Sequence, residues 1–186
     1  NVLGKEKYLI TVSSFKENKN FIMAYKAFKL AQKYVEGLKL YIIGDVKTGS
    51  FNNMDVLVSQ LQQDKDVVLL GRVADTELIK FYSNAMAFVF PSFYEGFGIP
   101  VLEAQACGCP VISSDSSALL EVLGDSAILC NSNKENDFAK AIIKIAQDKI
   151  MSEYLVRRGY ENVKRFSWGR SAEYIRDIIK SYDDEY

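Results

Sequence analysis

The chain has 186 residues, enough for one domain that buries a sizeable core without disulfides or a structural metal. Its 23 lysine and arginine residues nearly balance 24 aspartate and glutamate residues, and the net charge of −1 excludes a globally basic surface of the kind that binds nucleic acid or anionic membranes. The absence of histidine excludes catalytic pairs in which histidine activates a serine or cysteine. Any anion site must therefore be local.

The cysteines and the first residues of the chain indicate where the protein resides and whether it is part of a longer protein. Cys107, Cys109 and Cys130 are an odd number and lie beside apolar residues, which favours reduced core thiols and a cytoplasmic protein. Without histidine or a second cysteine pair, we expect no metal site. The chain opens at Asn1, with no methionine, signal peptide or apolar run of about 18 residues. We interpret residues 1–7 as the end of a linker in a longer protein.

Short apolar runs alternate with helical patterns along most of the chain. Strands are predicted at 8–13, 38–43, 67–70, 85–90, 111–114 and 127–129. Helices are predicted at about 20–36, 53–63, from 75 onward, 100–107, 117–122, 134–147, 150–165 and 168–182, with Asp75, Ser117 and Ser167 as amino-terminal caps. This alternation predicts an α/β fold, a Rossmann-like doubly wound parallel sheet of about six strands in the order 3-2-1-4-5-6.

The stretch 91–111, PSFYEGFGIPVLEAQACGCPV, has the features of an anion-binding turn. It follows a buried strand, and Gly96 and Gly98 allow the backbone N–H groups to approach a ligand. Pro100 suits the start of a helix, which Gly108 ends. Helix amino termini after a strand bind phosphates through free N–H groups.

Two carboxylates flank these donors. Ile99, Leu102 and Ala106 share one helix face, which we expect to pack on the sheet, whereas Glu103 lies outside that stripe in the first helical turn and needs a hydrogen-bonding partner. Glu95 precedes the glycine turn. This arrangement suits a ligand with both hydroxyls and phosphates. The alternative is an ordinary strand, turn and helix, with Glu95 solvated and Glu103 capping its own helix.

Two lysines lie at the amino end of the helix predicted from residue 20. The helix dipole disfavours cations there unless an anion lies between them, so Lys16 and Lys19 are candidate phosphate ligands. Two lysines in a solvated loop are the alternative.

The sequence around the two glutamates resembles a known family. Glu95 and Glu103 enclose GFGIPVL within VFPSFYEGFGIPVLEAQACGCPVISSD, and the match continues through LLEVLGDSAILC. This is similar to the E-x7-E signature of the retaining nucleotide-sugar glycosyltransferases of the GT-B fold, called group 1 or family 4. The resemblance covers nearly the whole chain, but only the carboxyl-terminal, donor-binding half of such an enzyme.

The resemblance implies roles for individual residues. Glu95 contacts hydroxyls of the donor sugar, Glu103 contacts the nucleotide ribose, and Lys19 contacts the diphosphate; Glu95 and Lys19 are the catalytic candidates. Many members have Gly-Arg where this chain has Ser13-Ser14, so one phosphate-binding arginine is missing. The remaining binding candidates are Ser14, Gly44, Arg72 and Val73, the last two at the base, together with Gly96, Phe97, Gly98 and Ile99 at the diphosphate.

The resemblance also implies an overall activity. We expect the donor-binding domain of a retaining enzyme that moves a sugar from a nucleotide-diphosphate sugar, GDP-mannose or a UDP-sugar, to a glycan or lipid-linked acceptor. No metal or other cofactor is required. A missing N-terminal domain would bind the acceptor, which can be membrane-associated, so the protein would be cytoplasmic with peripheral contact at the inner membrane face. This fragment alone should be inactive.

Alternatives remain at this point. A sugar epimerase of the GT-B fold shares the architecture, although the long match speaks against it, and a non-catalytic nucleotide-sugar-binding module or partner subunit is a different class of function. The C-terminal helix, residues 167–183, either packs towards the missing domain, as in full-length relatives, or is an ordinary edge helix.

Overall fold

The computed structural model describes residues 7–45 and 54–183. The predicted linker, apart from Lys7, and the start of the helix predicted at 53 lie outside the described residues. Six strands form one parallel sheet in the order β3-β2-β1-β4-β5-β6, as predicted. The strands are β1 Tyr8–Val12, β2 Lys39–Ile43, β3 Val67–Gly71, β4 Ala87–Phe90, β5 Val111–Ser114 and β6 Ile128–Cys130.

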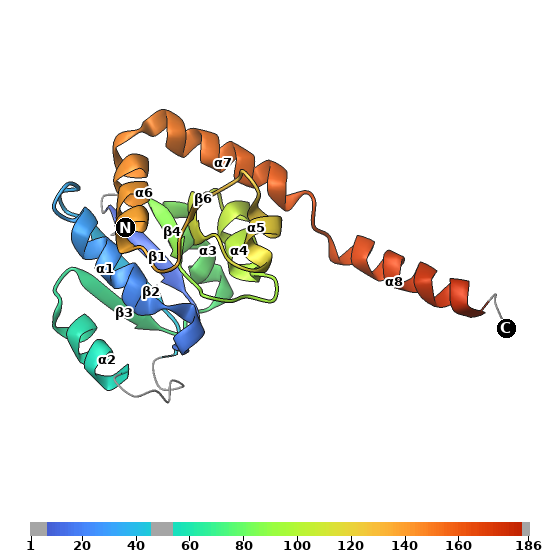
Figure 1. Ribbon diagram of the computed structural model, residues 1–186, viewed down its shortest axis with the longest axis horizontal. Coiled ribbons are helices and arrows are strands. Elements are labelled where there is room, and N and C mark those ends of the chain that lie inside the picture. The colour runs from blue at the N-terminus through green and yellow to red at the C-terminus, as the bar shows by residue number, and fades with distance from the viewer. Residues whose placement is uncertain (1–6, 46–53, 184–186) are drawn as a thin grey trace.

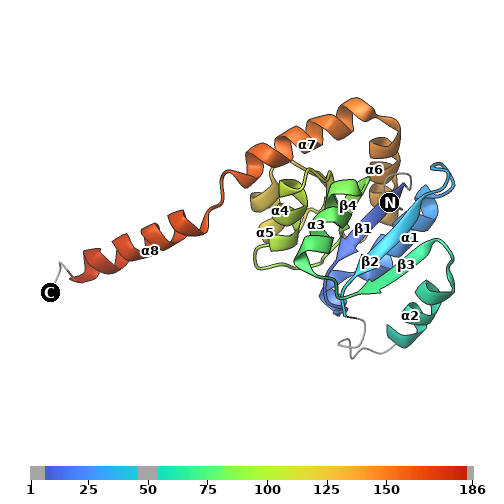
Figure 2. The same cartoon turned by 180° about the vertical axis from the view of Figure 1, so that it is seen from behind.

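Helices cover both faces of this sheet (Figures 1 and 2). One face carries α1 (Phe21–Ala31), α2 (Met54–Gln63) and α6 (Glu135–Gln147), and the other carries α3 (Asp75–Asn84), α4 (Ile99–Ala106) and α5 (Ala118–Leu123). The helix α7 (Lys149–Val163) contacts both α4 and α6, and α8 (Trp168–Asp183) projects away from the body. A short 3-10 helix, η1 (Glu17–Lys19), precedes α1.

The strands alternate their side chains between two hydrophobic clusters, as expected for a sheet covered on both faces. Leu9 faces α1 and α6, whereas Tyr8 and Ile10 face α3 and α4. The rings of Tyr8 and Tyr41 stack with centroids 4.4 Å apart. All six strands end at one edge of the sheet, where the predicted site residues follow them.

The three cysteines are free, with Cys109 and Cys130 buried and Cys107 partly buried. Burial raises the pKa of the Cys130 thiol to about 12 and also raises the pKa of Cys107. These thiols are therefore protonated and unreactive at neutral pH.

Two predicted helix ends are wrong. The first long helix was expected to reach residue 36, but α1 ends at Ala31, whose carbonyl accepts the N–H groups of both Tyr34 and Val35 in turns that do not continue the helix. Asp75 was expected to cap α3, but it is the first helical residue. Ala74 occupies the cap position, and its N–H donates to the carboxylate of Glu77 at 3.5 Å.

The stripe expected to pack α4 on the sheet is wrong for two of its three residues, and only Leu102 packs against the core. Ile99 is 48% exposed and Ala106 is exposed, and the buried face is instead formed by Val101, Ala104 and Gln105. The polar Gln105 conceals this face in the sequence. Its amide is fully used inside the protein, because it donates to the carbonyl and hydroxyl of Ser126 and accepts from Asn162.

The last helix forms where predicted, and the N–H of Arg170 lies 3.5 Å from the Ser167 hydroxyl, the predicted cap. Its side chains from Trp168 to Ser181 are exposed, including the apolar line that contains Ile175 and Ile178. Within the described residues, no helix is long and apolar enough to cross a membrane.

Candidate functional site

The turn between β4 and α4, residues 91–98, is built around a required glycine. Gly98 has φ +97°, and a Cβ atom there would lie 2.7 Å from Leu119 Cδ2. Gly96 is exposed, and a Cβ there would meet no atom within 4 Å. In the described part of the chain, no protein acceptor takes the N–H groups of residues 96–99. They are therefore available to an anion.

The segment after β1 is fastened to this turn through Asn18. The Phe93 N–H donates to the Asn18 carbonyl at 2.8 Å, and Asn18 Nδ2 donates to the Tyr94 carbonyl at 3.2 Å. These two bonds join residues more than seventy positions apart and place the end of η1 against the turn.

Asn20 makes a second attachment. It has a left-handed backbone (φ 51°), is 5% exposed, and its Nδ2 donates to the carbonyls of Pro91 and Ser132 at 3.2 and 3.1 Å. Asparagine tolerates this conformation better than most residues. The preceding residue, Lys19, is thereby directed at the turn.

Lys19 and Glu95 form an ion pair at this place. Lys19 Nζ lies 2.7 Å from Glu95 Oε1, and the side chains are only 17% and 11% exposed. The ammonium also lies 5.8 Å from the centroid of the Phe90 ring. The two residues assigned separate parts of one ligand from the sequence are thus in direct contact.

Serines from the β5–α5 segment hold the other side of the turn. Ser117, predicted as a helix cap, makes no side-chain cap bond; its hydroxyl accepts the Glu95 N–H at 3.0 Å instead. The hydroxyls of Ser114 and Ser116 donate to the Ser92 carbonyl at 2.5 and 2.9 Å. The turn is therefore fixed from both sides, and the role of Ser117 could not be seen without its distant partner.

The ends of β1, β2 and β3 meet beside this turn. Gly44 has φ +150°, and a Cβ atom there would lie 1.7 Å from the Ser13 carbonyl oxygen, so no other residue fits without moving the backbone. Its N–H donates to the Gly71 carbonyl at 2.8 Å. Ser14 is half-buried, and its carbonyl accepts the Lys16 N–H at 2.8 Å. Packing alone thus accounts for the glycine at position 44.

The candidates at the end of β3 differ in burial. The Arg72 side chain is 79% exposed and its Nη2 lies 3.4 Å from Asp45 Oδ2. Val73 is partly buried and packs against the cluster on the α3 and α4 face. The Arg72 side chain is thus open to solvent, whereas Val73 contributes to the core.

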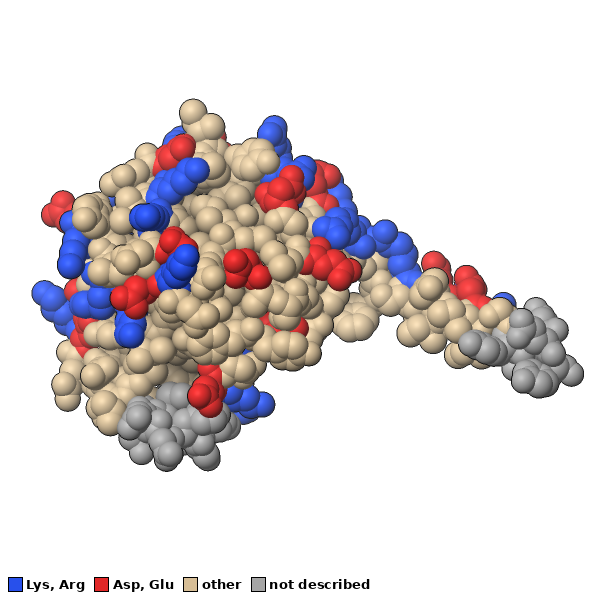
Figure 3. Space-filling model, viewed as in Figure 1, with Lys and Arg blue, Asp and Glu red and all other residues tan. Residues whose placement is uncertain are grey.

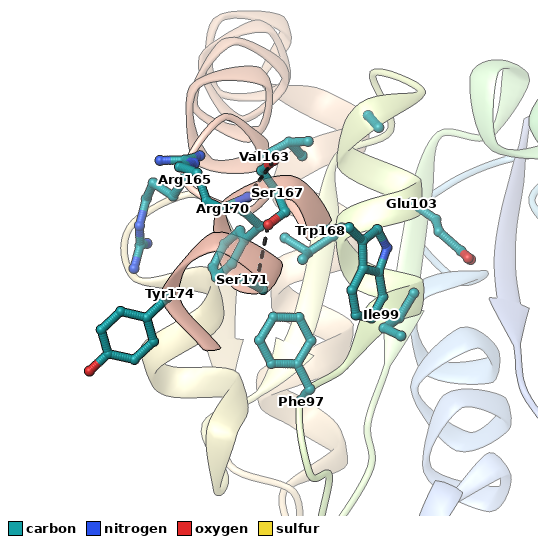
Figure 4. A pocket seen from close by; sticks show the side chains of 13 residues that line it. Phe97, Ile99, Glu103, Val163, Arg165, Ser167, Trp168, Arg170, Ser171 and Tyr174 are labelled. Atoms are coloured by element: carbon teal, nitrogen blue, oxygen red, sulfur yellow. Dashed lines mark hydrogen bonds between the residues drawn. The ribbon is translucent and has the colours of Figure 1, made fainter. Parts of the chain in front are cut away.

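A cavity of about 620 Å³ lies between α4 and the start of α8 (Figure 4). Phe97, Ile99 and Glu103 line it together with Phe166 and Trp168. The rings of Phe97 and Phe166 meet edge to face with centroids 5.4 Å apart. Phe166 and Trp168 could not be predicted as part of this cavity, because neither lies near the glycine turn in the sequence.

A second cavity, of about 720 Å³, lies between α3 and α4 and also includes Glu103, with Asp75 and Tyr82. Burial, and then the negative charge of Asp75, raises the pKa of the Glu103 carboxyl. No acidic residue lies in the first turn of α4, so the predicted first-turn position of Glu103 is wrong. Glu103 is exposed and lines both cavities, and no hydrogen bond joins its carboxylate to another described residue.

Charges of both signs are mixed over the body, and lysine and arginine side chains gather where α7 gives way to α8 (Figure 3). Two of these arginines bond within the junction. Arg165 donates to Asn162 Oδ1 at 2.8 Å, and Arg170 donates to the Lys164 carbonyl. The Arg170 bond joins α8 to the backbone at the end of α7.

Known proteins share this sequence and fold. The family model of the glycosyl transferases group 1 matches residues 1–162. The O-antigen chain mannosyltransferase B of Escherichia coli is 31% identical over 166 residues, which are 89% of this chain and 44% of that protein. Sucrose-phosphate synthase of Thermosynechococcus elongatus superposes with a TM-score of 0.83 at 26% identity, covering 98% of this chain and 47% of the other.

A further solved structure, Alr3699/HepE of Anabaena in complex with UDP and glucose, has a TM-score of 0.79 at 17% identity, covering 97% of this chain and 50% of that one. The chain thus spans about half the length of the proteins that it matches. Its six-stranded parallel sheet is the Rossmann-like fold of GT-B enzymes. With the family model matching most of its length, the chain belongs to the glycosyl transferases group 1.

Proposed function

We propose that the chain is the donor-binding half of a retaining glycosyltransferase that uses a nucleotide-diphosphate sugar. The observation that carries this proposal is the contact between Lys19 and Glu95 beside four N–H groups that have no protein acceptor in the described part of the chain. It places a cation, backbone donors and a carboxylate acceptor together at the carboxyl ends of parallel strands, where such folds bind ligands.

Each part of the donor has a matching group. The diphosphate would accept from the N–H groups of residues 96–99, from Lys19 and from the Ser14 hydroxyl, and the sugar hydroxyls would donate to Glu95. The ribose hydroxyls would donate to Glu103, which is exposed and lines the cavities on both sides of α4. The base would meet the backbone at Arg72 and Val73. As the glycosidic bond breaks, Lys19 and the amides stabilise the charge of the leaving diphosphate, and no metal is part of this proposal.

The relatives support a range of donors and acceptors. The E. coli relative is named a mannosyltransferase, which supports GDP-mannose, and the Anabaena structure contains UDP and glucose, which supports a UDP-sugar. We propose that a domain outside this chain delivers a glycan or lipid-linked acceptor to the same face of the sugar that the diphosphate leaves. The prediction of a cytoplasmic protein with peripheral membrane contact belongs to this proposal.

A thermal-shift panel tests donor binding. GDP, UDP and ADP, with their mannose and glucose conjugates, would be added to the 186-residue chain. A bound ligand at 100 times its Kd stabilises the protein by about 2.7 kcal/mol. Stabilisation by one nucleoside diphosphate and its sugar conjugate supports the proposal. If none of the compounds stabilises the chain, the proposal is contradicted. Transfer by the chain alone would contradict the need for a second domain.

The non-catalytic alternative needs a different experiment. A longer protein that contains this sequence would be mixed with the nucleotide sugar that binds. Binding without release of the nucleoside diphosphate, over a range of glycan and lipid-linked acceptors, would favour the binding module. Release that depends on an acceptor supports the transferase.

A further inference from the structure

Glu95 places a negative charge directly against the cation assigned to the diphosphate. The Lys19 and Glu95 side chains are 2.7 Å apart and mostly shielded from water. Charges interact more strongly in such a place than on an open surface, where water and salt screen them. Glu95 therefore weakens the attraction of Lys19 for any anion that arrives beside it.

The surrounding bonds keep the carboxylate near this position. Ser117 accepts the Glu95 N–H, and Asn18 and Asn20 attach the Lys19 segment to the same turn. Neither partner belongs to a loose loop, so a ligand meets both charges together. An anionic ligand gains from Lys19 and is opposed by Glu95, whereas a ligand that also carries hydroxyls can donate them to the carboxylate.

A sugar donor and its product differ in this respect. In a nucleotide sugar both phosphates are esterified, and each carries about one negative charge. In the nucleoside diphosphate the terminal phosphate carries no ester and is attached only through the anhydride bond. Like a phosphate monoester it ionises a second time, with a pKa of about 6, which gives it roughly −1.5 to −2 at pH 7. Loss of the sugar thus gives the nucleoside diphosphate more negative charge and removes the hydroxyls that would donate hydrogen bonds to Glu95.

We infer that Glu95 is a specificity-determining residue that favours the nucleotide sugar and disfavours the free nucleoside diphosphate. The inference rests on the proposed function. It gives Glu95 a second role, since repulsion of the product assists its release after transfer. It also differs from the expectation that Glu95 touches only the sugar, because that role would leave the affinity for free nucleoside diphosphate unchanged.

Isothermal titration calorimetry of Glu95→Gln tests the inference. GDP with GDP-mannose, and UDP with UDP-glucose, would be titrated into the wild-type chain and the variant. For the pair that the wild type binds, the variant should bind the free diphosphate about three- to tenfold more tightly, the scale of one removed charge in a partly shielded site. The conjugate should gain nothing, so the ratio of the two Kd values shifts by about threefold or more.

Two variants serve as controls. Glu95→Asp keeps the charge and should not tighten binding of the diphosphate. Glu17→Gln removes an exposed carboxylate two residues from Lys19 and should have less effect than Glu95→Gln. Circular dichroism would verify folding, and Glu95→Ala replaces Glu95→Gln if the latter does not fold.

The outcomes separate this inference from the proposed function. If the wild type binds a diphosphate and removal of the Glu95 charge leaves or weakens that affinity, the inference is overturned and the proposed function stands. An equal gain in Glu17→Gln also overturns it, since the effect would then be a general change of charge. If the thermal-shift panel selects ADP, ADP and ADP-glucose are titrated in the same way. If the wild type binds none of the compounds of that panel, the proposed function fails and the inference fails with it.

Discussion

The turn at residues 91–98 and the helix α8 differ in how their backbone structure relates to their contacts with the rest of the domain. The turn has no regular structure, yet side chains from two other segments, 18–20 and 114–117, bond to it. In contrast, α8 is a regular helix of 16 residues whose described side chains are all exposed. Regular backbone structure is thus a poor measure of how firmly a segment is attached to the domain.

This difference has a physical origin. The turn lacks its own backbone ladder, so asparagine and serine side chains satisfy its carbonyl and N–H groups, and each bond ties it to a distant element. The α8 backbone satisfies itself, and its apolar line contacts no core. Substitutions should therefore have large effects at the turn and small effects in α8.

Among the substitutions that compare the turn with α8, Asn20→Ala should have the largest effect on stability. It removes two hydrogen bonds to carbonyls near the turn and places alanine in a left-handed conformation. We expect a loss of about 2–4 kcal/mol in the free energy of unfolding, measured by urea denaturation. Asn20→Gly also lacks the two hydrogen bonds, but glycine adopts the left-handed conformation without strain. This variant should therefore be about 1 kcal/mol more stable than Asn20→Ala. If both variants were as stable as the wild type, the hydrogen bonds of the Asn20 side chain would contribute nothing to stability.

Lys19→Ala should mainly affect ligand binding. Loss of a charged hydrogen-bond donor should weaken nucleoside diphosphate binding by about 1.5–3 kcal/mol in calorimetry. It also leaves the carboxylate of Glu95, which is 11% exposed, without its cation, so some loss of stability is expected too. Lys16→Ala is the matched control, since Lys16 is exposed, and it should change the affinity less. An unchanged affinity in Lys19→Ala would refute the phosphate role.

Glycine to alanine substitutions compare the two regions directly. Gly98→Ala should cost about 1–3 kcal/mol, because its φ is positive and the new Cβ meets Leu119. Gly96→Ala meets no atom within 4 Å and should change stability by less than about 0.5 kcal/mol. In α8, Gly169→Ala should stabilise the helix by up to about 1 kcal/mol. Similar losses at positions 98 and 96 would show that the geometry of Gly98 is not the cause.

The sequence predicted the sheet well, because buried parallel strands are short apolar runs and the crossover rule leaves few possible orders. All six strands and their order 3-2-1-4-5-6 are confirmed. Helix positions were also predictable from periodicity. The face of α4 was not, because the buried Gln105 breaks the apolar pattern and its partners lie on other segments.

The candidate site was predictable in composition but not in contacts. The glycines and Glu95 stand in one recognisable stretch, and Lys19 stands at a helix start. Lys19 and Glu95 are 76 positions apart in the sequence, and no local sequence pattern indicates that they form an ion pair. The predicted capping bond of Ser117 is absent for the same reason. A serine before a helix predicts a cap, and only the folded chain shows that its hydroxyl accepts the Glu95 N–H instead.

Glu103→Gln should give a small effect that depends on pH. The folded state raises the pKa of Glu103, so ionisation is disfavoured on folding and stability falls as pH rises from the unfolded pKa through the folded one. The variant should therefore melt higher than the wild type at pH 7 and equally at pH 3.5. Water screens this exposed residue, so the difference should be below about 3 °C. A lower melting temperature at pH 7 would mean that Glu103 has a stabilising partner.

Ile175→Glu in α8 should have the smallest effect. Ile175 is 57% exposed, so a carboxylate there loses little hydration and no buried contact. Exposed substitutions of this kind usually change stability by less than about 0.5 kcal/mol. Ile142→Glu in α6 is the matched comparison, because Ile142 is fully buried and an unpaired charge there should prevent folding or cost several kcal/mol. A loss above about 1 kcal/mol in Ile175→Glu would show that α8 is covered in solution, and a dependence of that loss on protein concentration would identify a second copy of the chain as the cover.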